Sequence, residues 1–261
     1  MDKIKVLVNG CNGHMGQTVC RLIAERYDMK VVAGFDKSVK EDFYQFPVFT
    51  DIEDLKTFLD GSFGNGVFPD VIIDFSSPTC TVQLLDKVVL YDHIPIVIAT
   101  TGFSDEDISY IQEIAEESPI FLSSNMSFEI KLLETLLRDI SPKFAYDHDV
   151  EISEAHHSRK KDTPSGTANM FANAINEALD NKMEIVYGRS GKRNSNEIGV
   201  SSIKGGNIAG GHTVRFIGQF DELVITYRAF SRELFAENAI TAALFMADET
   251  SPGLFDMNDL Y

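Results

Sequence analysis

The chain has 261 residues and a formal net charge of −17, from 40 acidic and 23 basic residues. This excess of negative charge disfavours nucleic acids and anionic membrane surfaces as partners. Its hydrophobic fraction of 44% and charged fraction of 24% are ordinary for a soluble globular protein, and its length suffices for one large domain or two modest ones.

Three cysteines, Cys11, Cys20 and Cys80, form no CxxC motif and have no metal-ligand spacing. An odd number of scattered cysteines is typical of reduced thiols, so we expect a cytoplasmic protein. The N-terminal residues lead directly into an apolar strand-like run without the pattern of a signal peptide. No apolar run approaches the length of a membrane span, which agrees with that location.

In the first half of the chain, apolar strand-like runs alternate with helical patterns. The expected strands cover 4–8, 30–35, 71–75, 94–99 and 120–122. Helices are expected after the first strand and over 54–59, 79–90 and 105–116, with a Gly-rich loop over 61–66. Such alternation predicts an α/β fold of the Rossmann type, a doubly wound parallel sheet buried on both faces.

The turn between the first strand and the first helix has a GxxGxxG pattern, formed by Gly10, Gly13 and Gly16. Glycines there permit a tight turn, close approach of the backbone to a pyrophosphate, and close helix–strand packing. The second strand ends in Asp36-Lys37. An acidic residue at this place usually binds ribose hydroxyls, which favours NAD, whereas Lys37 is suited to a 2′-phosphate and favours NADP. Both cofactors remain open.

Small polar residues follow three of the later strands, at Ser76-Ser77, Thr100-Thr101 and 123–127. Ligands of parallel sheets bind at the carboxyl ends of the strands. These residues are therefore candidates to bind a ribose, a carboxamide or the edge of a substrate.

The pattern changes after Ser127. We expect an apolar helix over 128–140 with Ile130, Leu133, Leu136, Leu137 and Ile140 in period, and then an alternating strand over 150–154. Three further strand-like runs over 198–203, 211–216 and 222–229 predict a mostly antiparallel sheet. A last apolar helix, over about 234–247, is expected to return to the first sheet. The prediction is a dinucleotide-binding domain over 1–127, completed by 232–261, and an inserted α+β substrate-binding and oligomerisation domain over 128–231.

Residues 154–168, with the sequence Glu-Ala-His-His-Ser-Arg-Lys-Lys-Asp-Thr-Pro-Ser-Gly-Thr-Ala, gather two histidines and three cations before a helix. Thr163 is expected as the N-cap and Pro164 as the first helical residue. The backbone N–H groups near Ser165, Gly166 and Thr167 would then form an anion site. The expected apolar face of this helix consists of Ala168, Phe171, Ala172, Ile175 and Leu179.

A charge run of this kind is by itself more often a solvated basic loop. Two observations favour a site. The run is basic in a strongly acidic chain, and it lies downstream of a nucleotide-binding pattern. The combination is suited to holding a carboxylate and moving a proton.

Together these motifs resemble the dihydrodipicolinate reductase family (4-hydroxy-tetrahydrodipicolinate reductase) of the diaminopimelate and lysine pathway. The resemblance spans almost the whole chain in the right order. It is carried by Gly10-x-x-Gly13-x-Met15-Gly16, Asp74-Phe75-Ser76, Thr100-Thr101-Gly102, Asn125-Met126-Ser127, residues 154–168, and Gly253-Leu254-Phe255-Asp256-Met257. It implies reduction of 4-hydroxy-tetrahydrodipicolinate to tetrahydrodipicolinate with NADH or NADPH, in a homotetramer.

The resemblance also implies residue roles. His156 is similar to the family's general acid/base and Lys160 to its proton donor, while His157, Gly166 and Thr167 match the contacts to the substrate carboxylates. The glycine turn and the resemblance together give the expected cofactor contacts. These are Gly10, Asn12, Gly13, His14, Met15, Asp36, Lys37, Ala99, Thr100, Thr101, Ser124, Asn125, Met126 and Ser127. No metal site is expected, because no set of Cys, His and Asp has ligand spacing.

Four residues depart from the family pattern: His14 and Lys204 where Arg is usual, Ala99 where Gly is usual, and Tyr227 where His is frequent. They bear on cofactor preference and on the substrate domain. Two other functions stay open, a non-catalytic NAD(H)-binding redox sensor and a reductase of another imino acid. The expected partner is a small cyclic dicarboxylate, with no nucleic acid and no membrane.

Overall fold

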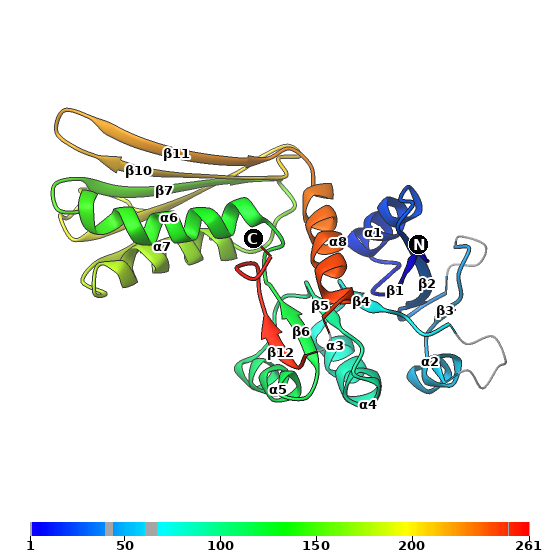
Figure 1. The fold of residues 1–261 in the computed structure, drawn as a ribbon. Helices are drawn as coiled ribbons and strands as arrows, with labels where there is room; N and C mark the ends of the chain where they lie inside the picture. The colour runs from blue at the N-terminus through cyan, green and yellow to red at the C-terminus, as the bar shows by residue number, and fades with distance from the viewer. Residues whose placement is uncertain (1, 40–43, 61–66, 250, 261) are drawn as a thin grey trace. The chain divides into compact units, whose positions relative to one another are not determined.

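The computed structural model describes residues 2–39, 44–60, 67–249 and 251–260. The chain forms two compact units, Met1–Met126 with Glu233–Tyr261, and Ser127–Arg232 (Figure 1). The Gly-rich loop expected over 61–66 lies outside the described residues. In the described part of the chain, no helix is long and apolar enough to cross a membrane.

A parallel sheet forms the centre of the first unit, with the strand order β12-β6-β5-β4-β1-β2-β3. The strands are β1 (Ile4–Asn9), β2 (Met29–Phe35), β3 (Val48–Phe49), β4 (Val71–Asp74), β5 (Ile96–Ile98), β6 (Pro119–Leu122) and β12 (Gly253–Phe255). Every neighbouring pair is parallel. The predicted doubly wound sheet is confirmed. The short strands β3 and β12 were not predicted, because two or three residues carry no readable period.

Helices cover both faces of this sheet. On one face lie α1 (His14–Ala24) and α8 (Glu233–Ala247), which contact each other and the strands beneath them. The other face carries α2 (Ile52–Leu59), α3 (Pro78–Leu84), a π-helical turn η1 (Leu85–Val89), α4 (Leu90–Asp92) and α5 (Asp105–Ala115). The expected return of the last helix to this sheet is confirmed. Its buried alanines, Ala236, Ala239 and Ala243 among them, allow close approach to the strands.

The second unit contains a five-stranded sheet with the order β11-β10-β7-β9-β8. Its strands are β7 (Asp149–His156), β8 (Glu184–Tyr187), β9 (Glu197–Lys204), β10 (Gly210–Ile217) and β11 (Glu222–Ala229). The pairs β11-β10 and β10-β7 are antiparallel, whereas β7-β9 and β9-β8 are parallel. The sheet is therefore mixed rather than mostly antiparallel, because the helix after β7 returns the chain in the direction of β7.

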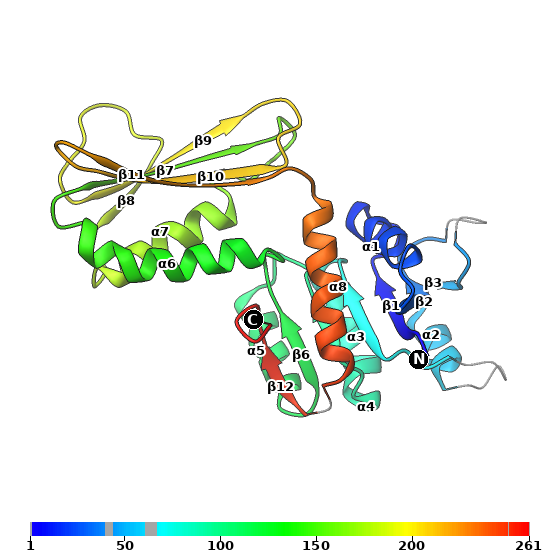
Figure 2. The same cartoon turned by 45° about the horizontal axis from the view of Figure 1, so that its top comes forward.

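Helices α6 (Phe128–Phe144) and α7 (Gly166–Ala178) lie side by side on one face of this sheet (Figure 2). Phe171 of α7 and Phe216 of β10 are buried in the core between helices and sheet. The predicted apolar face of α7 is confirmed. On α6 the apolar stripe is narrower than expected, since Leu136 is 40% exposed while Ile130 and Leu137 are buried.

Candidate active site

The glycine turn between β1 and α1 depends on glycine at two positions. Gly10 has φ +78°, and a Cβ there would lie 2.5 Å from the carbonyl oxygen of Phe75. A Cβ at Gly16 would lie 2.1 Å from the carbonyl oxygen of Gly10. Gly13 is the N-cap of α1, and because glycine has no side chain, no side-chain cap accepts hydrogen bonds from the first N–H groups of the helix. A turn of this kind, closely packed and without a side-chain cap, fits the pyrophosphate of a dinucleotide.

Asp36 lies at the end of β2 and turns back to the glycine turn. Its carboxylate accepts hydrogen bonds from the backbone N–H of Asn12 at 2.9 Å and of Lys37 at 2.7 Å. The side-chain amide of Asn12 donates a hydrogen bond to the backbone carbonyl of Ser38. His14 and Lys37 are exposed and Met15 is half-buried. The structure thus brings together Asn12, Asp36 and Lys37 from the predicted cofactor set.

The polar residues after β4 and β5 converge on a buried carboxylate. Asp74 accepts hydrogen bonds from Asn9 Nδ2 at 2.9 Å, Ser76 Oγ at 2.6 Å and Thr100 Oγ1 at 3.1 Å. Burial raises the pKa of Asp74, and the hydroxyl hydrogen bonds oppose that rise. Thr100, which was expected to contact the cofactor, is buried next to Ala99, and its hydroxyl is hydrogen-bonded to Asp74 inside the protein. Thr101 is exposed.

The predicted cofactor residues after β6 differ in exposure. Ser124 is exposed and Asn125 half-buried, whereas Met126 is 3% exposed and its carbonyl accepts from Asn238 Nδ2. Ser127 is buried and caps α6 by accepting from Ile130 N–H, and its hydroxyl lies 3.1 Å from the Tyr227 hydroxyl.

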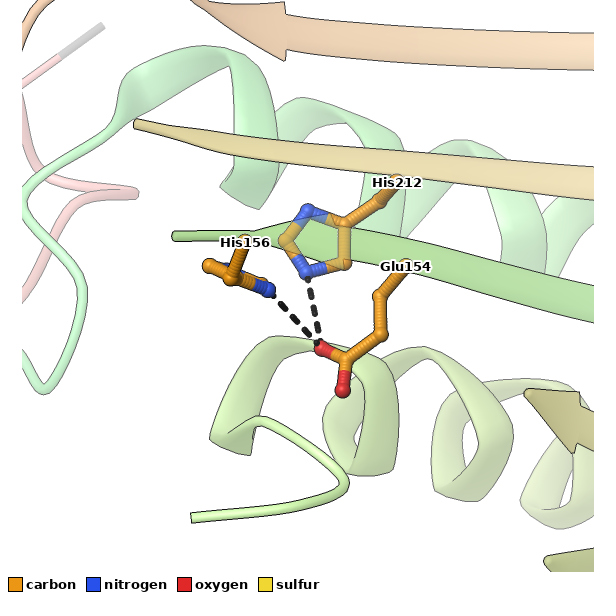
Figure 3. A group of neighbouring side chains, drawn as sticks. All are labelled: Glu154, His156 and His212. Atoms are coloured by element: carbon orange, nitrogen blue, oxygen red, sulfur yellow. Dashed lines mark ion pairs between the residues drawn. The ribbon is translucent and has the colours of Figure 1, made fainter. Parts of the chain in front are cut away.

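In the second unit, strand β7 directs Glu154 and His156 to the same buried side, because side chains alternate along a strand. His212 of β10 lies directly opposite Glu154. Figure 3 shows both imidazoles directed at one carboxylate oxygen. The distances from Glu154 Oε2 are 3.4 Å to His156 Nδ1 and 3.8 Å to His212 Nε2. Three buried ionisable side chains thus meet at the end of the sheet.

The Glu154 carboxylate also accepts hydrogen bonds from two other elements. Ser165 N–H donates to it at 3.0 Å, and the Ser202 hydroxyl of β9 donates at 2.6 Å. Burial raises the pKa of Glu154, but these hydrogen bonds outweigh burial and hold the pKa below its usual value. Glu154 is therefore a carboxylate at neutral pH.

The two imidazoles are shifted toward their neutral forms. Burial lowers the pKa of His156, and Glu154 opposes this shift. The pKa of His212 is lowered to about 4, mainly by burial and to a smaller extent by the nearby His156. The rings of His156 and His212 meet edge to face with centroids 5.3 Å apart.

His157 points to a different partner. The Arg232 guanidinium, which can only donate, contacts His157 Nε2, so that nitrogen is the acceptor. Burial and the charge of Arg232 lower the pKa of His157. The neutral ring therefore carries its proton on Nδ1, which is buried and has no hydrogen-bond partner among the described residues. The hydrogen-bonding capacity of this N–H is therefore unused within the described part of the chain.

Lys160 lies in the loop after β7. Its ammonium donates to Asp162 at 2.7 Å, and its carbonyl accepts from Lys204 Nζ at 2.9 Å. The hydrogen bond from Lys160 lowers the pKa of Asp162. Arg159 and Lys161 beside it are exposed. The loop therefore presents positive charge close to His156.

Helix α7 begins later than the sequence indicated. Its N-cap is Ser165, whose hydroxyl accepts from Ala168 N–H, and its first residue is Gly166. The predicted N-cap Thr163 and the predicted first residue Pro164 precede the helix, joined by a cis peptide bond. A tertiary contact accounts for the later start of the helix: the Glu154 carboxylate on β7 accepts a hydrogen bond from the backbone N–H of Ser165. The predicted anion site therefore loses that group, while exposed Gly166 and half-buried Thr167 stand in the first turn.

Sequence reasoning missed His212 and gave Glu154, Ser202 and Arg232 no role. Glu154, His156 and His212 have ligand atoms within 4.8 Å of one another, close enough in space to hold a metal ion. His212 lies 56 positions after His156, so the spacing of neighbouring residues in the sequence does not connect the two. The available signal was the alternation of β10, which places His212 on the same side as Val214 and Phe216.

Models of known protein families match nearly the whole chain. The family models described as dihydrodipicolinate reductase, N-terminus, and dihydrodipicolinate reductase, C-terminus, match residues 4–126 and 129–261. The chain belongs to the dihydrodipicolinate reductase family. As a member of that family it is an oxidoreductase with a nicotinamide cofactor, which the closely packed glycine turn and Asp36 fit.

Two relatives are 4-hydroxy-tetrahydrodipicolinate reductases. That of Caldanaerobacter subterraneus is 42% identical over 260 residues, and that of Clostridium botulinum is 40% identical over 259 residues. In each case 98% of both chains is covered. A solved structure of dipicolinate-bound dihydrodipicolinate reductase from Paenisporosarcina sp. TG-14 has a TM-score of 0.77 at 23% identity, over 98% of this chain and 99% of that one. This likeness shows that the two share a fold.

Proposed function

We propose that this chain reduces 4-hydroxy-tetrahydrodipicolinate to tetrahydrodipicolinate in diaminopimelate and lysine biosynthesis. The observation that carries the proposal is the setting of His156 at the end of β7, held by buried Glu154 and followed by a cationic loop and the first turn of α7. The relatives that match over their full length carry this activity in their names. A dicarboxylate substrate needs such a combination in a chain of net charge −17.

The substrate carboxylates are bound by groups that can only donate. We assign one set to the Nδ1–H of His157 and another to the first-turn backbone of α7 at Gly166 and Thr167. Support comes from Arg232, which accounts for the protonation of His157 on Nδ1, and from the absence of a side chain at Gly166, where an added Cβ would meet nothing within 4 Å. Helix dipole and N–H groups together favour a carboxylate there.

His156 and Lys160 supply the proton. Hydride addition to a ring carbon conjugated with C=N leaves an enamine-like species that needs a proton on carbon. The ammonium of Lys160, held by Asp162 at 2.7 Å, is the donor, and neutral His156 beside it is the general acid/base. The nicotinamide cofactor supplies the hydride when bound.

The first unit is the cofactor domain, and we propose that it accepts both NADH and NADPH. The Asp36 carboxylate suits the ribose hydroxyls, while exposed Lys37 and His14 suit a 2′-phosphate. Two groups of residues would contact the cofactor. One belongs to the glycine turn and the start of α1, and the other follows β5 and β6. They are Gly10, Gly13, Met15, Ala99, Thr101, Ser124 and Asn125. Thr100, Met126 and Ser127 contribute through the backbone, because their side chains are buried.

The second unit binds substrate and forms the oligomer. We propose a cytoplasmic homotetramer joined through the sheet face opposite α6 and α7, without nucleic acid or membrane partners. The exposed apolar residues Ile203, Ile217 and Val224 support this, since register places all three on that face.

The test is oxidation of NADH and of NADPH by the wild-type enzyme with freshly generated 4-hydroxy-tetrahydrodipicolinate, with a cyclic imine that carries a single carboxylate as the control substrate. We expect turnover of the dicarboxylate with both cofactors. For the control we expect kcat/KM to be at least about 100-fold lower, because one of the two sets of carboxylate-binding groups is left without a partner. Equal use of both imines would assign the enzyme to another imino acid. Tight cofactor binding without any turnover would make it a redox sensor.

A further inference from the structure

Glu154 is the point where four elements meet. It is 2% exposed and lies on β7, two residues before His156. The N–H before the first turn of α7, the Ser202 hydroxyl of β9, His156 of its own strand and His212 of β10 all contact its carboxylate. A buried carboxylate is costly unless it is paired, so a charge at this position needs a reason. The backbone N–H and the hydroxyl would be satisfied by a neutral acceptor; an imidazole that gains a proton would not.

The geometry distinguishes the two nitrogens of His156. Nδ1 faces Glu154 Oε2 at 3.4 Å. Nε2 faces the backbone of Gly210, where an added Cβ would lie 3.4 Å away, in van der Waals contact. Glycine at this position therefore leaves Nε2 uncovered from that side. A carboxylate on one nitrogen fixes the proton of a neutral imidazole there and leaves the other nitrogen to exchange protons.

His212 does not compete for the carboxylate. Its Nε2 lies 3.1 Å from Ser165 Oγ and 3.8 Å from Glu154 Oε2, so the Ser165 hydroxyl is its nearer polar partner. The ring stays neutral and stacks edge-on against both His156 and Phe171. His212 thus acts as an uncharged wall that holds the His156 ring from the β10 side.

We propose that Glu154 is the positioning residue for His156: it accepts the Nδ1–H, fixes the ring and its tautomer, and presents Nε2 as the atom that takes up and releases the proton. The identity of the reaction rests on the proposed function, but the geometry does not. The distance of 3.4 Å is long for a hydrogen bond, and such contacts commonly tighten when substrate binds.

The first test compares Glu154→Gln with Glu134→Gln. Glu134 is a buried carboxylate of α6 in the same unit, pairs with Lys131 and Arg138 outside the site, and undergoes the same loss of charge. We expect Glu154→Gln to lower kcat by about 10- to 100-fold with a KM change of less than about 3-fold, and Glu134→Gln to keep wild-type kcat. Equal effects of the two substitutions would overturn the proposal.

A double-mutant cycle with His156→Ala separates positioning from a purely structural role. If Glu154 acts through His156, adding Glu154→Gln to His156→Ala lowers kcat no further. If Glu154 only supports Ser165 and the start of α7, the two losses multiply, and the proposal fails.

The tautomer itself is measured by nitrogen-15 NMR of the histidine side chains in the substrate-free protein. We expect His156 in wild type to carry its proton on Nδ1, and Glu154→Gln to shift the population toward Nε2. A wild-type proton on Nε2 overturns the proposal. So does a stoichiometric divalent metal ion in purified wild type that Glu154→Gln loses. The wild-type spectrum needs neither turnover nor a folded variant, so its result stands apart from the fate of the proposed function.

The groups that face His156 set the sign of a further effect. They are Glu154 on its own strand, His212 on β10, and His157, Lys160 and Asp162 in the loop. Lys204 lies opposite His156 in the register of β9. Of these, Glu154 contributes most to raising the pKa of His156. The imidazole titration, followed in the same spectra, should move to lower pH in Glu154→Gln, and a move to higher pH would contradict the assignment.

Discussion

Two buried carboxylates organise the residues around them in the same way. Asp74 gathers Asn9, Ser76 and Thr100 at the strand ends of the first unit. Glu154 gathers Ser165, Ser202 and His156 in the second. Each was visible in the sequence as part of a motif, but its partners come from other elements. The residues close to each carboxylate in sequence could therefore be singled out as members of a motif, whereas His212 of β10 could not.

At the residue scale, Lys37 tests cofactor choice. Lys37→Ala should raise the KM for NADPH by about 10-fold, the worth of one charge-assisted contact to a phosphate, and leave the KM for NADH within about 2-fold. Lys30→Ala, an exposed lysine of β2, is the matched control. Steady-state kinetics with both cofactors would contradict the assignment if the two KM values changed alike.

His212 makes stability depend on pH. Its pKa of about 4 in the folded protein lies below the ordinary value of 6.5, so the unfolded chain binds more protons between these values. Its contribution is fully present above pH 6.5 and is lost as pH falls toward 4, by up to about 3 kcal/mol. We expect His212→Gln to flatten the decline in unfolding free energy from pH 7 to pH 5, measured by denaturant titration. An unchanged slope would show that His212 is not buried in its neutral form.

At the element scale, the glycine turn ties β1 to α1. Gly16→Ala would place a methyl group 2.1 Å from a backbone oxygen, so the helix must shift. We expect a loss of about 1–3 kcal/mol or more in unfolding free energy. Gly13→Ala is the control, because its Cβ would lie 3.2 Å from the same oxygen at an ordinary negative φ. Its cost should be distinctly smaller, and equal costs would contradict the packing argument.

Elements with a strong period were predictable, and those defined by partners were not. The apolar runs of β1, β4 and β5 and the face of α7 follow from spacing alone. Local spacing did not reveal the parallel pairing of β7 with β9, nor the start of α7 at Gly166. Both depend on a contact between distant segments. The Ser165 N–H bonded to Glu154 overrides the local preference for Thr163 and Pro164 as a helix start.

At the scale of the whole molecule, a chain of net charge −17 concentrates positive charge at Arg159, Lys160, Lys161 and Arg232. The division of the chain into two units assigns the glycine turn to one and the His156 site to the other. Composition and motif order together predict that an anionic ligand binds at this cationic loop.

The proposed tetramer gives a prediction at this scale. Val224→Asp places a charge on the outer sheet face, opposite Arg215 and beside Ile217, and should dissociate the tetramer, because loss of the apolar side chain and burial of a carboxylate both weaken the interface. Tyr27→Asp, at a residue 89% exposed in the first unit, is the control and should leave assembly unchanged. Sedimentation velocity decides between them. A tetramer that survives Val224→Asp would place the interface elsewhere.

The proposed function depends on His156 and Lys160 as the residues that supply the proton. The most direct measurement is kcat for 4-hydroxy-tetrahydrodipicolinate with wild type, His156→Ala and Lys160→Ala, alongside the cofactor dissociation constant of each. We predict that kcat falls by about 100- to 10,000-fold in both variants while cofactor affinity stays within about 2-fold. Variants that keep kcat within a few-fold of wild type would rule out these roles for His156 and Lys160.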